Sequence, residues 1–282
     1  MGGQSMHSFT LAGRSVRRIG YGTMQLAGPK ALGEPADPDR AKAAVRAAVD
    51  AGVRLIDTSG YYGPEVANRL LAEALRPYPD DLLIATKVGA RRSPDGGFVA
   101  DAAPAAIQAA VRDNLAQLGV ERLPLVHARF MPDSTVPWAE TVGALAALRD
   151  EGLIEHVGIS NVTLELLDQA RAVTPIASVE NEYHVGRSGG RDVLDATTAA
   201  GIPYLAFRPL GNGALAGEGS PLTEHARRLG VPAATLALAW LLDLAPNVAV
   251  IPGTSDPGHL ADLVAAEELA LPSAVRAALD EA

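Results

Sequence analysis

The chain has 282 residues, 48% of them hydrophobic and 20% charged, which is the size and composition of a globular domain with a large core. A formal net charge of −9 and the lack of a Lys/Arg-rich run argue against nucleic acid as a partner. The absence of cysteine excludes a disulfide framework, a thiolate nucleophile and a cysteine-ligated metal.

The N-terminal sequence shows neither a targeting signal nor a membrane span. MGGQSMHSFTLAG lacks a basic stretch followed by an apolar run, so no signal peptide is expected. No window of about 18 uninterrupted apolar residues occurs in the chain, so no membrane helix is expected. We therefore expect a cytoplasmic protein without a membrane partner. The segment Phe9–Ile19, with Ala12-Gly13-Arg14 at its centre, predicts a β-hairpin.

After this hairpin, short apolar runs alternate with amphipathic segments. The apolar runs predict strands at Ile19–Gly22, Val53–Asp57, Leu82–Lys87, Leu123–Phe130, Ile154–Ser160, Ala177–Glu180, Tyr204–Phe207 and Val248–Pro252. Apolar residues recurring at three and four predict helices at Asp39–Ala51, Pro64–Leu75, Pro104–Leu118, Trp138–Asp150, Leu164–Ala172, Arg191–Ala200, Thr235–Asp243 and His259–Ala266. Several predicted helices are followed by a glycine suited to a left-handed cap, namely Gly52, Gly119, Gly152 and Gly201.

Strands that are each followed by a helix indicate a closed parallel barrel. The number and order of the predicted elements are those of a (β/α)₈ TIM barrel, an α/β fold. We expect one barrel domain over residues 1–282, preceded by the N-terminal hairpin. The alternative, an open doubly wound sheet, requires G-x-G-x-x-G after its first strand, and Gly20–Gln25 (GYGTMQ) lacks the third glycine.

Polar side chains stand at the ends of consecutive predicted strands, where a barrel of this kind places its chemistry. They are Asp57, Lys87, His127, the pair Ser160-Asn161, and Glu180. Asp57 and Lys87 come from neighbouring strands and are expected to pair. Lysine is rare in this chain, so its presence in an apolar strand is conspicuous.

Tyr62 lies five residues after Asp57, on a loop beside this predicted pair. A nearby ammonium would lower its pKa from about 10 towards the range of a general acid. His127 would then donate a hydrogen bond to a carbonyl oxygen, and no metal is needed. Each residue alone also has a structural interpretation, such as a helix cap, a paired lysine or core packing. Their occurrence together at adjacent strand ends favours catalysis.

Two other classes of function remain open from the residues. A barrel glycosidase needs two carboxylates, and Asp57 and Glu180 supply them, but this interpretation leaves Tyr62 and Lys87 without a role. A non-catalytic cofactor-binding module that senses redox state is the third interpretation, and the intact set of polar strand ends argues against it.

The same residues resemble a known family. Asp57–Gly63 (DTSGYYG), then Thr86-Lys87, then His127 resemble the Asp-Tyr-Lys-His tetrad of the aldo-keto reductases. Tyr62 is matched rather than Tyr61, because the family tyrosine is followed by glycine. The resemblance extends along the whole chain, through Gly20–Met24, Gly158–Asn161, Pro209–Gly211 and Ile251–Ser255.

The resemblance implies an NADPH-dependent oxidoreductase that reduces a small aldehyde or ketone to an alcohol, with the proton from Tyr62. NADPH is the expected cofactor, with NADH as an alternative, and the enzyme is expected to be a monomer or a weak homo-oligomer. The implied catalytic residues are Asp57, Tyr62, Lys87 and His127. The implied cofactor contacts are Gly22, Thr23, Asp57, Ser160, Asn161, Glu180, Phe207, Arg208, Pro209, Leu210, Gly211, Gly213, Gly253, Thr254, Ser255 and His259. The implied substrate contacts are Met24, Tyr61 and Arg129.

Several sequence segments are similar to those of the bacterial pyridoxal reductases within this family. They are Gly20–Pro29, Ile56–Pro64, Asp80–Arg92, Ser160–Thr163 and Ile251–Ser255. This similarity suggests a pyridoxal-like substrate, and a ketone of a sugar or secondary metabolite is the alternative. The chain departs from the family pattern at positions where other residues are usual: Glu180 for Gln, Arg208 for Ser, Gly253 for Lys and Leu263 for Asn.

Overall fold

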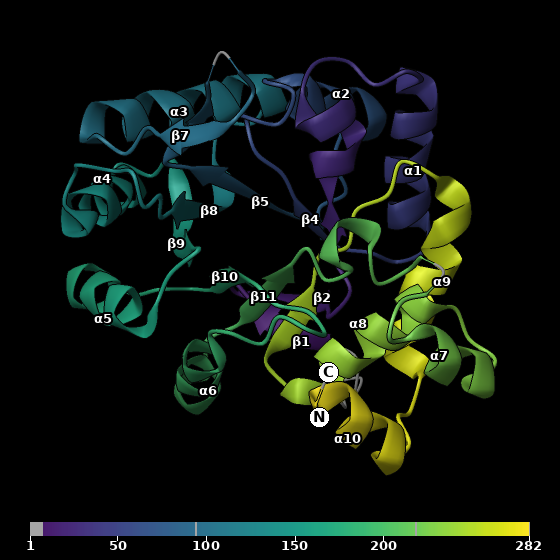
Figure 1. Ribbon diagram of the computed structural model, residues 1–282. Helices are drawn as coiled ribbons and strands as arrows, with labels where there is room; N and C mark the ends of the chain where they lie inside the picture. Colours follow the sequence, from purple (N-terminus) through teal and green to yellow (C-terminus); the bar gives the residue numbers. More distant parts are fainter. Residues whose placement is uncertain (1–7, 94, 218, 282) are drawn as a thin grey trace, which may run out of the picture.

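A closed barrel of parallel strands forms the centre of the computed structural model, which describes residues 8–93, 95–217 and 219–281 (Figure 1). The first seven residues, on which the expectation about a signal peptide partly rests, lie outside this described part. The barrel strands are β3 (Tyr21–Gly22), β4 (Leu55–Asp57), β5 (Leu83–Val88), β8 (Leu123–Arg129), β9 (Ile154–Ser160), β10 (Val179–Glu182), β11 (Tyr204–Phe207) and β12 (Val248–Val250).

The first and last strands of the sheet complete the ring. The sheet order is β12-β11-β10-β9-β8-β5-β4-β3, and each neighbouring pair is parallel. Ile19 forms a parallel bridge with Val250 across the remaining gap. The Gly20 amide donates to the Val250 carbonyl at 2.8 Å, and the Gly22 amide donates to the Pro252 carbonyl at 2.9 Å. The predicted (β/α)₈ barrel is therefore confirmed.

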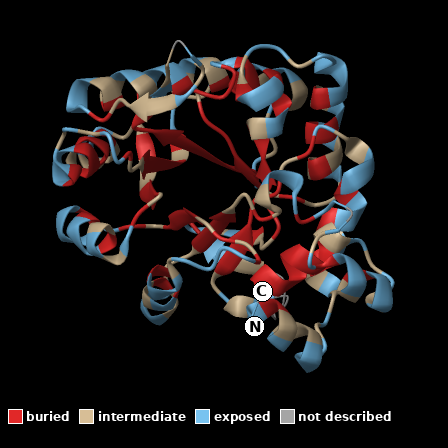
Figure 2. Ribbon diagram, in the orientation of Figure 1, coloured by how far each residue is buried: buried red, intermediate tan, exposed pale blue. Residues whose placement is uncertain are grey.

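Helices surround the barrel and turn one face to it (Figure 2). They are α1 (Pro38–Asp50), α2 (Val66–Leu75), α3 (Pro104–Leu118), α4 (Trp138–Asp150), α5 (Leu164–Val173), α6 (Arg191–Ala200), α7 (Thr223–Leu229), α8 (Ala233–Leu244), α9 (Leu260–Val264) and α10 (Ser273–Asp280). The local sequence determines where α1 begins. Asp37 caps the helix by accepting from the Arg40 amide, and Pro38 is its first residue. The four glycines predicted as caps all have positive φ.

The N-terminal hairpin closes the end of the barrel opposite the carboxyl ends of the strands. Strands β1 (Ser8–Leu11) and β2 (Arg14–Arg17) pair antiparallel around a turn at Ala12-Gly13, where both residues have positive φ. Leu11 and Val16 pack against the apolar side chains inside the barrel. The predicted hairpin is confirmed, and it leaves the other end of the barrel as the entrance.

Strand alternation divides the barrel interior into an apolar layer and a polar layer. Side chains two residues apart on a strand share a face. On β8, Leu125 belongs to the interior apolar cluster, and His127 and Arg129 follow it on the same face. The same spacing places Asp57 above Leu55 and Lys87 above Ala85. The apolar layer thus supports the polar one from below.

Several elements differ from the sequence-based expectation. The strand expected at Ala177–Glu180 begins later, at Val179, and continues to Glu182. The helix expected at His259–Ala266 is only α9, with short 3₁₀ turns on both sides. Elements that were not predicted are α7, α10 and the hairpin of β6 (Ala90–Arg92) and β7 (Phe98–Ala100). This hairpin follows β5 directly and brings Phe98 to the barrel entrance.

Within the described ranges, no helix is long and apolar enough to cross a membrane.

Candidate active site

A buried ion pair joins the ends of two adjacent barrel strands. Lys87 on β5 donates from Nζ to Asp57 Oδ2 on β4 at 2.5 Å, and it also donates to the Thr58 carbonyl at 3.3 Å. Both charged side chains are almost completely buried. The predicted pairing of Asp57 with Lys87 is therefore confirmed. Such a pair tolerates burial because each charge finds its partner at close range.

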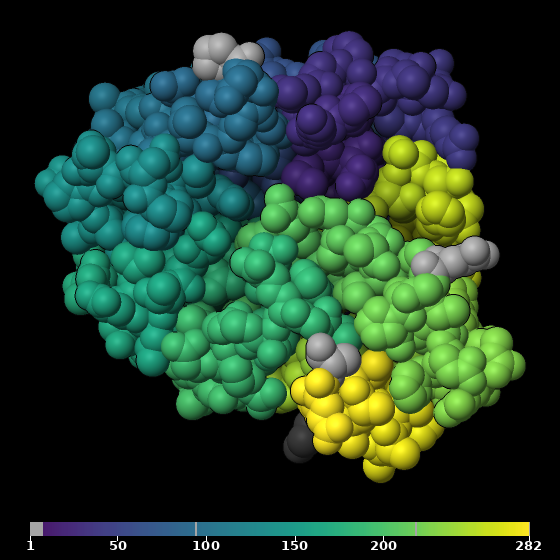
Figure 3. All heavy atoms as spheres, in the orientation of Figure 1, coloured from purple at the N-terminus to yellow at the C-terminus, as the bar shows by residue number. Residues whose placement is uncertain are grey.

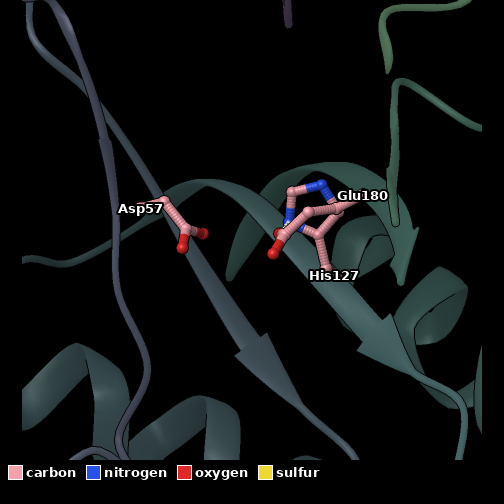
Figure 4. A group of neighbouring side chains, drawn as sticks. All are labelled: Asp57, His127 and Glu180. Atoms are coloured by element: carbon pink, nitrogen blue, oxygen red, sulfur yellow. Dashed lines mark ion pairs between the residues drawn. The ribbon is translucent and has the colours of Figure 1, made fainter. Parts of the chain in front are cut away.

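A second carboxylate, Glu180 on β10, shares the same ammonium. Its Oε1 lies 3.4 Å from Lys87 Nζ, and its side chain has no exposure to solvent. Figure 4 shows Asp57, His127 and Glu180 turned towards one another, with possible ligand atoms within 4.8 Å. Two carboxylates and an imidazole are ligands that a metal ion accepts. Here Lys87 already supplies the positive charge between the carboxylates, and this arrangement does not fit a second cation.

The charged groups of this cluster shift one another's pKa values. Burial raises the pKa of Asp57 above its ordinary range, the charge of Glu180 adds to this, and the Lys87 ammonium opposes it. Burial by itself would lower the pKa of Lys87, but the carboxylates of Asp57 and Glu180 raise it well above the ordinary value. Lys87 therefore keeps its proton at neutral pH, and a permanent positive charge lies at the bottom of the barrel entrance.

Tyr62 lies beside this positive charge. The Lys87 Nζ is 5.2 Å from the centre of the Tyr62 ring, and the neighbouring Tyr61 ring packs edge-on against it at 5.3 Å. Burial raises the pKa of the Tyr62 phenol, and the opposing effect of Lys87 is smaller. The expectation of a lowered pKa is therefore wrong for the protein without ligands. The phenol instead remains protonated at neutral pH, as a proton donor must be.

His127 is part of the cluster but does not reach the open pocket. Its Nε2 is 2.9 Å from Ser178 Oγ, and its Nδ1 is 3.4 Å from Glu180 Oε2. Gly158 provides the space for this position, because a Cβ there would lie 2.4 Å from the imidazole Cδ2. Both side chains are completely buried, but Glu180 lines the pocket and His127 does not. This placement differs from the expected contact with a carbonyl oxygen.

The buried imidazole predicts a pH-dependent contribution to stability. Burial lowers the pKa of His127 from 6.5 to about 3, with a smaller opposing effect of Asp57. Between these values the unfolded chain binds one more proton than the folded chain, so this group reduces the free energy of unfolding as pH falls. We expect His127→Gln to weaken the dependence by about 1.4 kcal/mol per pH unit between about pH 6 and pH 4. Urea unfolding at several pH values measures the slopes, and parallel slopes would contradict a buried neutral imidazole.

A polar network behind the ion pair holds the strand ends against the helices. Thr23 Oγ1 donates to Thr58 Oγ1 at 2.8 Å, and Thr58 Oγ1 donates to Asn68 Oδ1 at 2.7 Å. Asn68 Nδ2 then donates to Asn114 Oδ1 at 2.9 Å, and the Thr86 hydroxyl donates to the same oxygen at 2.6 Å. These side chains join β4 and β5 to α2 and α3, and they fix the backbone from which Asp57 and Lys87 extend.

An open pocket lies above the cluster, and Tyr62, Asp57 and Glu180 are among the residues that line it. Further lining residues are Met24, on the 3₁₀ turn that follows β3, and Tyr61, Phe98 and Arg129, from the loop before Tyr62, β7 and the end of β8. The remaining lining residues come from the ends of β3 and β11 and from the segments after β3, β11 and β12, namely Gly22, Gln25, Phe207, Arg208, Pro209, Leu210, Asn212, Gly213, Ile251, Pro252 and Gly253. In Figure 3 the segment after β11, in green, lies in the middle of the face shown.

The comparisons with known proteins agree with this geometry. The model of the "Aldo/keto reductase family" matches residues 18–282. The chain is 43% identical over 281 residues to pyridoxine 4-dehydrogenase of Escherichia coli, covering 98% of each chain. The chain belongs to the aldo/keto reductase family. It is therefore an oxidoreductase of carbonyl compounds, as the sequence predicts.

Solved structures of similar shape include two aldo-keto reductases from bacteria. The reductase superimposes on glycerol dehydrogenase of Gluconobacter oxydans with a TM-score of 0.87 and 25% identity, covering 99% of this chain and 95% of the other. It superimposes on an aldo-keto reductase of Klebsiella pneumoniae in complex with NADPH with a TM-score of 0.81 and 26% identity, covering 95% and 91%.

The other residues expected to contact the cofactor do not line the reductase pocket. They are Thr23, Ser160, Asn161, Gly211, Thr254, Ser255 and His259. Ser160 Oγ is buried near the end of β9 without a hydrogen-bond partner. Asn161 donates from Nδ2 to the Phe130 carbonyl at 2.9 Å, and Thr254 Oγ1 lies 3.2 Å from His259 Nδ1. The structure thus brings the expected groups to one end of the barrel but not all to one surface.

The sequence interpretation missed several residues of the reductase site. Gln25, Phe98, Asn212, Ile251 and Pro252 line the pocket, and Ser178 contacts His127. A signal for Phe98 existed, because Gly96-Gly97 separates two short runs in the manner of a hairpin turn. Ser178 lies two residues before Glu180 on the same face of its chain segment, so strand alternation would have indicated it.

Proposed function

We propose that this aldo-keto reductase acts as one barrel domain that uses NADPH to reduce a small aldehyde or ketone, and that pyridoxal is the first substrate to test. The proposal depends on one observation: the phenol Tyr62 lines an open pocket, and its ring lies 5.2 Å from the Lys87 ammonium. The Asp57 carboxylate holds that charge in place.

The reaction needs a proton at the carbonyl oxygen, and Tyr62 supplies it. NADPH, when bound, supplies the hydride that is added to the carbonyl carbon. As the carbon–oxygen double bond becomes single, the phenol O–H bond breaks and an O–H bond forms on the substrate. The phenolate left on Tyr62 is stabilised by Lys87, and solvent returns its proton. His127 orients Glu180 from below rather than contacting the substrate.

The pocket residues fit a nicotinamide cofactor. Phe207 offers an aromatic face, and Glu180 offers a carboxylate that no hydrogen bond satisfies. Ser160 Oγ, which is buried outside the pocket lining, also has no hydrogen-bond partner. Glu180 accepts from a carboxamide NH₂ but donates nothing to it. The contacts proposed for the remainder of the cofactor are Gly22, Thr23, Asn161, Arg208, Pro209, Leu210, Gly211, Gly213, Gly253, Thr254, Ser255 and His259.

Pyridoxal is proposed because the similar E. coli protein is named pyridoxine 4-dehydrogenase and matches over nearly its whole length. Met24 and Tyr61 border the part of the pocket that would receive the substrate ring. The alternative substrate is a ketone of a sugar or secondary metabolite. A glycosidase is not favoured, because Asp57 and Glu180 share one ammonium instead of flanking a free space.

The test follows the loss of reduced-nicotinamide absorbance when purified protein is mixed with NADPH and pyridoxal. We expect NADPH-dependent turnover and formation of pyridoxine, and slower turnover with NADH. Turnover of a sugar or secondary-metabolite ketone, but not of pyridoxal, would select the alternative substrate. Tight NADPH binding without turnover of any carbonyl in a panel of aldehydes and ketones would contradict the proposal.

A further inference from the structure

Arg129 places a guanidinium at the wall of the pocket. It is the last residue of β8, two residues after His127, so both side chains are on the inner face of the barrel. The pocket that contains Tyr62 is also lined by Arg129. A permanent positive charge therefore lines the same pocket as the proposed proton donor.

This guanidinium differs from its neighbours because the described part of the chain provides it with neither an ion pair nor a side-chain hydrogen bond. Its Nε is buried and has no hydrogen-bond partner. By contrast, Arg208, which also lines the pocket, lies 3.6 Å from Glu182, and Arg92 donates to the carbonyls of Gly96 and Ala31 at 2.8 Å each. Burying part of an unpaired charge is costly unless a ligand completes its contacts.

Aromatic side chains hold Arg129 in place. Its Cζ lies 5.8 Å from the centre of the Phe98 ring and 5.7 Å from the centre of the Phe207 ring. Contacts of this kind orient a guanidinium but leave its N–H groups free to donate. The Tyr61 hydroxyl is also buried without a hydrogen-bond partner, and the charge of Arg129 affects its pKa, which burial raises overall. Two donors near the same cavity thus lack an acceptor.

We propose that Arg129 binds an anionic oxygen of the carbonyl substrate, and that Tyr61 assists it. The reductase would then select aldehydes and ketones that carry a carboxylate, a phosphate or an ionised phenol. This inference rests on the proposed function, because it assigns the substrate class of that same pocket. Pyridoxal satisfies it through its acidic ring hydroxyl. A guanidinium–anion contact is among the stronger hydrogen bonds, and it gives selectivity as well as affinity.

The test compares two aldehydes of similar shape and different charge, 4-carboxybenzaldehyde and its neutral methyl ester. For Arg129→Met we expect kcat/KM to fall about tenfold to a hundredfold with the carboxylate and by less than about threefold with the ester. Arg129→Lys, which keeps the charge, should recover part of the selectivity. Arg171→Met is the matched control, because Arg171 is an exposed arginine on the outer helix α5, and it should leave both values unchanged.

Two further measurements distinguish a failure of the Arg129 inference from a failure of the proposed function. NADPH binding, followed by protein fluorescence, should be unchanged in Arg129→Met; weaker binding would assign the guanidinium to the cofactor and overturn the inference. Equal losses with both aldehydes would also overturn it. Pyridoxal and pyridoxal 5′-phosphate, assayed in parallel, show whether a phenolate or a phosphate is the preferred anion. If the wild-type protein reduces none of these aldehydes, the proposed function itself has failed.

Discussion

Replacing Tyr62 by Phe is expected to abolish nearly all turnover while leaving NADPH binding intact. The substitution removes a hydroxyl and retains the ring that packs against Tyr61. General acid catalysis contributes about a hundredfold to ten-thousandfold to rate, so kcat should fall by that amount. Stopped-flow absorbance measures the chemical step, and fluorescence titration measures the dissociation constant of NADPH.

The control for this variant is Tyr78→Phe. Tyr78 donates to the Leu118 carbonyl at 2.9 Å, outside the residues that line the pocket, so the variant loses a hydroxyl without losing the proton donor. Its kcat should remain near the wild-type value. Tyr62→Phe with a kcat within about threefold of the wild type would show that another group gives the proton.

Replacing Lys87 by Met is expected to remove activity and also to destabilise the fold. Asp57 and Glu180 would then be buried without the ammonium that lies between them. Removing one partner of a buried pair typically costs about 3–5 kcal/mol of unfolding free energy. Activity falls as well, because no charge remains to stabilise the Tyr62 phenolate. Denaturant unfolding and steady-state kinetics measure the two effects separately.

Two variants keep this prediction testable. Lys42→Met removes an outer lysine that pairs with Asp39 and Glu73, and it should retain full activity. Lys87→Met combined with Glu180→Gln removes one uncompensated carboxylate, so it should regain much of the lost stability and none of the activity. An active double variant would refute the role of the lysine charge.

The sequence was sufficient to predict the barrel because its signals are local and repeated. Apolar runs end in a polar residue at Asp57, Lys87 and Glu180, and each lies at or near the carboxyl end of the strand that the run forms. The pairing of Asp57 with Lys87 followed from the order of adjacent parallel strands. These features depend on the alternation of side chains along a strand and on barrel topology, both of which short segments determine.

The predictions that were wrong or missing concern features that arise when residues distant in the sequence pack together. The imidazole of His127 points to Ser178 because Gly158, on the next strand, leaves room for it. The pKa of Tyr62 rises because the surrounding loops exclude water from the phenol, which the nearby lysine only partly offsets. Phe98 reaches the pocket through the β6–β7 hairpin, whose short strands carry little periodic signal.

A crystal structure of the reductase with NADP⁺ and pyridoxal would test the central claim most directly, because this combination binds without reacting. We expect the aldehyde oxygen within about 3 Å of Tyr62 Oη, with Lys87 still paired to Asp57 beneath the phenol. An aldehyde oxygen held by another side chain, with the Tyr62 hydroxyl directed away from it, would contradict the assignment of the proton donor.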